Sequence, residues 1–110
     1  SVRYTSSRVL SSRGYNVLQA YDGRHCLREL LKARGQVDLI LLDIMMPDLN
    51  GIMLFNAIRR RYPNIKVIFL SALQPPEPVK DLLKSEGHIA NITKPFDYDR
   101  LVDAVNGALE

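Results

Sequence analysis

Three polar residues whose side chains suit phosphoryl transfer each follow an apolar run that predicts a β-strand. They are Asp43, Ser71 and Lys94, which lie 28 and 23 residues apart. In an open parallel sheet the carboxyl ends of the strands meet at one edge, and binding sites form beyond that edge. We therefore expect one pocket to hold a carboxylate, a hydroxyl and an ammonium group.

These three groups together predict chemistry at phosphorus. A carboxylate can attack a phosphoryl group and form an acyl phosphate. An ammonium group can neutralise the phosphoryl oxygens, and a hydroxyl can donate a hydrogen bond to one of them. Taken singly, each residue has an ordinary interpretation. Asp43 would be a turn residue, Ser71 a turn or cap residue and Lys94 a surface charge. Only their shared position at strand ends favours a site.

Helical and strand-like patterns alternate along the chain, which predicts an α/β fold with a parallel sheet. Glycines at 14, 35 and 87 are placed to end helices, and Asp97 is placed to cap the last one. The order we expect begins with a helix and then alternates strand and helix. The strands are expected at Asn16–Tyr21, Val37–Asp43, Lys66–Leu70 and Ile89–Thr93.

Composition indicates one ordinary globular domain. The chain has 110 residues, of which 46% are hydrophobic and 25% charged. No apolar run approaches the roughly 18 residues that a membrane-spanning helix needs, so no membrane contact is expected. The first residues contain no signal-peptide core, and Cys26 is the only cysteine. A cytoplasmic location is the expectation.

The formal net charge of +3 does not identify a nucleic-acid-binding protein. The basic residues are spread out except for the run Arg59-Arg60-Arg61. This run falls where a helix would face solvent, and that interpretation is favoured over contact with a partner or DNA. We expect no direct nucleic-acid binding by this domain.

Four short motifs resemble those of response-regulator receiver domains, the signalling modules of two-component systems. The segment from Asp43 to Gly51 resembles the phosphorylation-site loop D-x-x-M-P-x-x-x-G at every fixed position. Ser71-Ala72 resembles the Thr/Ser-Ala step, and Lys94-Pro95-Phe96 resembles Lys-Pro-Phe. The segment Ala-Tyr-Asp-Gly at 20–23 is similar to the turn after the family's second strand. The resemblance runs over residues 1–110, as one receiver domain.

The resemblance implies a flavodoxin-like, doubly wound parallel sheet of order 2-1-3-4-5 with five helices. It implies that Asp43 accepts a phosphoryl group and binds Mg²⁺, with the backbone carbonyl of Met45 as a further ligand. Ser71 would sense the phosphoryl oxygens, and Lys94 would pair with the carboxylate and then with the phosphate. The peptide bond between Lys94 and Pro95 would be cis. The domain would be a signalling module and not an enzyme.

Two departures from the family pattern matter. By the family spacing, the first, central strand and its acidic Mg²⁺-binding pair would lie before Ser1. We expect the natural protein to carry this strand, because losing it would remove on the order of 10 kcal/mol of apolar burial. A strand-swapped dimer is the weaker expectation. Without the pair, this chain would bind Mg²⁺ weakly or not at all. Second, Asn91 stands where the family usually has a switch aromatic, so we expect phosphorylation to reorder the Ser71 loop and the helix after it without an aromatic flip at 91.

The resemblance also implies partners. A histidine kinase or phosphotransfer protein would donate the phosphoryl group, and an effector domain or output protein would bind the surface formed by about residues 77–110. A homodimer is possible. The alternative is a degenerate receiver that binds partners without phosphorylation. A dehalogenase-type phosphatase is disfavoured because Met45 stands where it needs a second aspartate, and a flavin-mononucleotide-binding protein because no phosphate-cradling loop is present.

Overall fold

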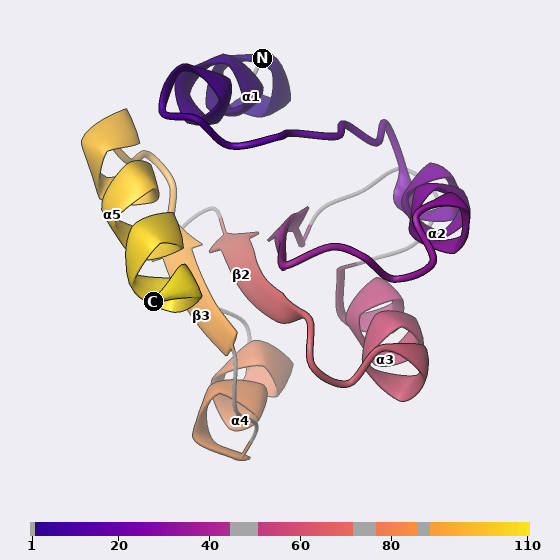
Figure 1. The fold of residues 1–110 in the computed structure, drawn as a ribbon. Coiled ribbons are helices and arrows are strands. Elements are labelled where there is room, and N and C mark those ends of the chain that lie inside the picture. The colour runs from indigo at the N-terminus through magenta and orange to yellow at the C-terminus, as the bar shows by residue number, and fades with distance from the viewer. Residues whose placement is uncertain (1, 45–50, 72–76, 86–88) are drawn as a thin grey trace.

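The structure is a computed structural model that describes residues 2–44, 51–71, 77–85 and 89–110. Helices and strands alternate through most of this length (Figure 1). The elements are α1 (Val2–Ser12), α2 (Gly23–Lys32), β1 (Leu39–Asp43), α3 (Gly51–Arg61), β2 (Lys66–Ser71), α4 (Glu77–Ser85), β3 (Ile89–Thr93) and α5 (Tyr98–Leu109).

The strands of the described residues form one parallel sheet in the order β1-β2-β3. Leu39 of β1 pairs with Lys66 of β2, and Ser71 of β2 pairs with Thr93 of β3. All three strands therefore end at the same edge of the sheet. The predicted α/β class with a parallel sheet is confirmed.

Each face of the sheet is covered by its own set of helices (Figure 1). Side chains alternate between the two faces along a strand, so Val67 and Phe69 face one way and Ile68 and Leu70 the other. The first pair packs with residues of α2, α3 and α4, and the second pair packs with residues of α1 and α5. Strand β2 thus contributes side chains to both apolar clusters.

The predicted strand Asn16–Tyr21 is wrong. Residues 15–20 contain no regular secondary structure and run as a long connection between α1 and α2 (Figure 1). An alternating pattern becomes a strand only when a neighbour supplies backbone hydrogen bonds, and β1 pairs with β2 alone in the described sheet. The strand predicted from Val37 begins at Leu39 instead, and the strand from Lys66 extends to Ser71.

Helix boundaries follow local signals closely. Asp22 caps α2 by accepting a hydrogen bond from the backbone N–H of His25, and Asp97 caps α5 by accepting one from Arg100. Gly14 and Gly35 follow α1 and α2 with positive φ angles of 93° and 70°, a conformation that glycine adopts without strain. Gly87, the predicted end of α4, lies outside the described residues.

The basic run at the end of α3 is not uniformly solvated. Arg60 and Arg61 are exposed, but Arg59 is half-buried and its guanidinium lies over the ring of Phe55. Its Nη1 donates to the carbonyls of Pro63 and Ile65 at 2.5 and 2.9 Å. Arg59 therefore stabilises the turn between α3 and β2 through these hydrogen bonds. None of the helices in the described ranges combines the length and the apolar character needed to traverse a bilayer.

Candidate functional site

Asp43 and Lys94 meet at the carboxyl edge of the sheet. Asp43 is the last residue of β1, and Lys94 directly follows β3. The Nζ of Lys94 lies 2.5 Å from Oδ2 of Asp43. The Lys94 side chain is 29% exposed to solvent and the Asp43 side chain 37%. The ion pair is therefore partly exposed to solvent. The structure brings together residues 51 positions apart.

Ser71 lies at the end of β2, between these two residues in the strand order. Its side chain is buried, and its backbone carbonyl accepts a hydrogen bond of 2.6 Å from the N–H of Lys94. The hydroxyl Oγ accepts a bond of 3.1 Å from Nδ2 of Asn91, in the middle of β3. A hydrogen-bonded path thus connects Asp43, Lys94, Ser71 and Asn91.

The backbone on both sides of Asp43 is tightly placed. Ile44 donates its N–H to the carbonyl of Leu70 at 3.2 Å, and Gly51 donates its N–H to the carbonyl of Ile44 at 2.9 Å. A Cβ at position 51 would lie 2.8 Å from the Cα of Ile44 and 3.0 Å from the carbonyl oxygen of Asp43. Only a glycine lets α3 begin this close to the end of β1.

Two further predicted site residues, Met45 and Ala72, lie outside the described residues. Pro95 follows Lys94 through a cis peptide bond. It is exposed, whereas the ring of Phe96 is partly buried and packs on the apolar cluster of α1 and α5.

The described residues do not by themselves form a Mg²⁺ site. Mg²⁺ takes octahedral oxygen coordination, usually with one or two carboxylates and several waters. Asp43 supplies a carboxylate at this edge, but its Oδ2 contacts Lys94. No group of three or more aspartate, glutamate, histidine and cysteine side chains able to hold a metal ion occurs within the described ranges.

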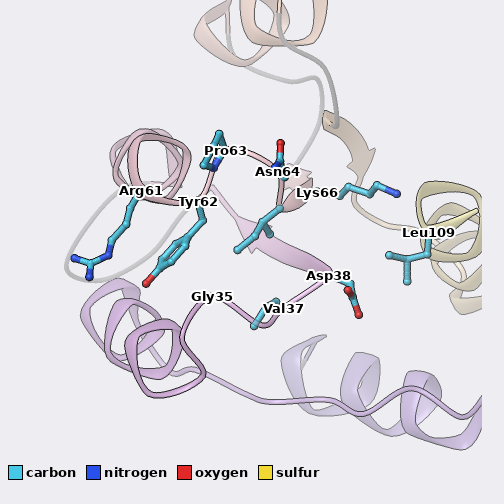
Figure 2. Close-up of a pocket in the computed structure, with 10 residues that line it drawn as sticks. Gly35, Val37, Asp38, Arg61, Tyr62, Pro63, Asn64, Lys66 and Leu109 are labelled. Carbon is cyan, nitrogen blue, oxygen red and sulfur yellow. The ribbon is translucent and has the colours of Figure 1, made fainter.

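A cavity of about 690 Å³ lies at the opposite end of the sheet (Figure 2). It is lined by Asp38 before β1, by Lys66 at the start of β2, and by residues of the turn after α3. Asp43 and Ser71 end the same two strands, so this cavity is separate from the site at the carboxyl edge. Its lining residues Arg61 and Lys66 offer positive charge and Asp38 negative charge. None of the lining residues has a buried side-chain atom that lacks a hydrogen-bond partner among the described atoms.

Comparison with known protein families shows to which family this chain belongs. The model of the response regulator receiver domain matches residues 1–106. The chain belongs to this family. Similar receiver domains occur in proteins of several architectures. The chain is 32% identical to sporulation initiation phosphotransferase F of Bacillus subtilis over 104 residues, which are 94% of this chain and 82% of that protein.

Two longer relatives place receiver domains within larger proteins. Sensor kinase CckA of Brucella abortus is 32% identical over 110 residues, all of this chain but 12% of the kinase. Transcriptional regulatory protein GlrR of Escherichia coli is 37% identical over 101 residues, 92% of this chain and 22% of the regulator. The chain therefore spans less than a quarter of the length of each of these two relatives.

Solved structures agree with the receiver fold. Chemotaxis protein CheY4 of Vibrio cholerae matches with a TM-score of 0.86 and 29% identity, covering 98% of this chain and 89% of that one. The receiver domain of NtrX from Brucella abortus matches with a TM-score of 0.85 and 26% identity, with the same coverage. The predicted receiver fold is thereby confirmed.

Sequence reasoning did not find the hydrogen bond from Asn91 to Ser71. The strand register explains this bond, because the partner of Ser71 in β3 is Thr93, two residues beyond Asn91. Residues two apart in a strand share a face, so Asn91 and Ser71 lie diagonally across adjacent strands. The register that creates this neighbourhood comes only with the folded sheet.

Proposed function

We propose that this receiver domain accepts a phosphoryl group on Asp43 from a phosphohistidine of a histidine kinase or phosphotransfer protein. The contact between Asp43 and Lys94 at the carboxyl edge is the observation that carries the proposal. A carboxylate at this edge is half-exposed and has a cation beside it, as attack on a phosphoryl group requires.

In the proposed step, one oxygen of the Asp43 carboxylate attacks the phosphorus atom. The new O–P bond forms as the P–N bond to the donor imidazole breaks, and the electron pair of that bond stays on the imidazole nitrogen, which takes a proton from solvent. Lys94 exchanges its contact with the carboxylate for one with the phosphoryl oxygens, so positive charge stays where negative charge develops. The Ser71 hydroxyl donates a hydrogen bond to the same group.

The added charge would change the surface of α4, β3 and α5, which follow the site in the chain. Ser71 and Lys94 flank the segment that contains α4 and β3, so a movement at either one reaches these elements first. Phosphorylation acts by biasing an element with two arrangements. We propose that the surface formed by residues 77–110 binds an effector domain or output protein in the cytoplasm, with a homodimer as one form of output.

The test is phosphate incorporation from a small acyl phosphate donor into the full-length protein. Wild-type protein should take up label that survives acid and is released by base, because an acyl phosphate forms. Asp43→Asn should abolish the label. Asp38→Asn is the matched control, because Asp38 is exposed at the opposite end of the same segment, and its label should equal that of wild type.

A degenerate receiver that acts without phosphorylation is the second candidate. It is favoured by Asn91 at the switch position and by the lack of a metal-binding group in the described part of the chain. Under this alternative, wild-type protein would remain unlabelled and would bind its partner with equal affinity in the wild-type and Asp43→Asn forms. Labelling at Asp43 with a changed partner affinity would exclude it.

A further inference from the structure

The hydrogen bond between Asn91 and Ser71 determines whether the Ser71 hydroxyl can donate a hydrogen bond to another group. The amide Nδ2 of Asn91 carries hydrogens and can only donate, so Oγ of Ser71 must be the acceptor in this 3.1 Å contact. A hydroxyl has one proton and two lone pairs. Accepting from Asn91 therefore occupies a lone pair and leaves the Ser71 proton available for another acceptor.

Few groups can accept the available Ser71 hydroxyl proton. Ser71 is only 3% exposed, and no acceptor for its hydroxyl proton is found among the residues that the structure describes. The backbone of Ser71 is joined to Lys94 by a 2.6 Å hydrogen bond, and Lys94 contacts Asp43. The hydroxyl is thus held beside the acceptor carboxylate with its proton unassigned.

The oxygen and the nitrogen of the Asn91 side-chain amide differ in their hydrogen bonding. Oδ1 of Asn91 is buried and has no hydrogen-bond partner among the described atoms, although nearly all buried polar groups in proteins have one. A half-turn of the amide would bring Oδ1 to Ser71, where it would take the hydroxyl proton. Two orientations of one side chain therefore correspond to a Ser71 that can or cannot donate.

We infer that Asn91 is a positioning residue that keeps the Ser71 hydroxyl ready to donate to a phosphoryl group on Asp43, using its amide in place of a switch aromatic. This inference rests on the proposed function. A phosphoryl oxygen that takes the Ser71 proton selects the amide orientation seen here. The same amide ties Ser71 to β3, whose Ile89 packs on the apolar cluster that contains Val79 of α4. Phosphorylation is thereby communicated to α4 and β3 through an amide.

The first experiment measures labelling rate and acyl phosphate lifetime in variants of the full-length protein. Asn91→Asp places a carboxylate, which can only accept, against Ser71 and takes its proton. Because a hydrogen bond to a charged group is worth roughly a 10- to 100-fold change, labelling should slow by at least about 10-fold. Asn64→Asp makes the same chemical change at an exposed site before β2 and should stay within about twofold of wild type.

A double-mutant cycle separates positioning from general damage. Asn91→Ala should slow labelling roughly 3-fold, the value of one neutral hydrogen bond, in the wild-type background. In a Ser71→Ala background it should change nothing further, because its effect acts through the hydroxyl. Equal effects in both backgrounds, or wild-type rates in Asn91→Asp, would overturn the inference. Cooperative thermal unfolding of each variant shows that all are folded.

A measurement without phosphate distinguishes failure of the inference from failure of the proposed function. The side-chain amide protons of Asn91 should exchange slowly with solvent in the NMR spectrum, and their resonances should move in Ser71→Ala. Normal labelling with unmoved resonances overturns the inference alone. Absence of label in wild type overturns the proposed function and the phosphoryl role of Asn91 together, even where the amide resonances show the bond to Ser71.

Discussion

Asp43, Ser71 and Lys94 carry the chemistry proposed for this receiver domain, but their positions depend on residues with no chemistry of their own. Gly51 is the clearest case. Its missing side chain lets the start of α3 lie against the backbone of Asp43 and Ile44. Backbone atoms cannot rotate away as a flexible side chain can, so a Cβ at this position must displace either the helix or the end of β1.

Gly51→Ala should therefore lower the free energy of unfolding by about 1–3 kcal/mol, the usual cost of overpacking, and should slow labelling of Asp43. Urea denaturation and phosphate incorporation measure the two effects. Gly107→Ala is the control, because a Cβ there meets nothing within 4 Å and alanine favours a helix by up to about 1 kcal/mol. Equal stability of both variants would contradict the close approach at Gly51.

At the scale of elements, α5 shows how a local signal sets a boundary. Asp97 has an extended backbone, with φ −86° and ψ 158°, and its carboxylate accepts from the N–H of Arg100. The helix then buries Leu101, Val102 and Val105 against the sheet. The cap fixes where α5 starts, and the start fixes which residues face the core.

Asp97→Ala should lower the free energy of unfolding by about 1 kcal/mol, because an N-cap carboxylate is lost. Asp99→Ala, in the first turn of the same helix, should have a much smaller effect. The Asp99 side chain is 89% exposed and its ion pair with Arg13 is long, at 3.6 Å, and exposed ion pairs contribute little. Denaturant unfolding of the two variants side by side is the measurement, and equal losses would refute the cap.

At the scale of the whole molecule, one sheet separates two apolar clusters. Leu54 lies in the cluster of α2, α3 and α4, and Leu101 in that of α1 and α5, and both side chains are fully buried. Because β2 contributes alternate residues to both clusters, neither can form without the sheet. The domain should therefore unfold as one cooperative unit.

Leu54→Ala and Leu101→Ala should each lower the free energy of unfolding by about 2–5 kcal/mol, through lost burial and a residual cavity. Their side chains lie on opposite faces of the sheet, so the double variant should equal the sum of the singles within about 0.5 kcal/mol. Chemical denaturation followed by circular dichroism tests both points. Two separate transitions in either single variant would show that the clusters fold independently.

Local patterns were sufficient for much of this structure. The apolar run at 89–93 predicted β3 with its observed bounds, and Asp97 predicted the cap of α5. The shared edge of parallel strands predicted that Asp43 and Lys94 would be neighbours, and they are in contact. These features depend on side-chain periodicity, caps and strand direction, all of which are encoded within a few residues of each position.

Features that depend on a distant partner were not determined by the sequence alone. Residues 16–21 alternate like a strand but form none, because a strand also needs a neighbour that offers backbone hydrogen bonds. The basic run after Ile58 reads as one solvated face, yet Arg59 bonds the carbonyls of the next turn. In each case the outcome was decided by the tertiary environment of the segment.

The candidate site at the carboxyl edge shows the same division. Its three chemical groups and their common edge follow from sequence, because parallel strands must end together. What the fold alone decided is the register of β2 against β3, which sets Asn91 diagonally against Ser71, and the approach of Gly51 to the end of β1. Register and close approach arise from the packing of segments far apart in the chain, so no local pattern could specify them.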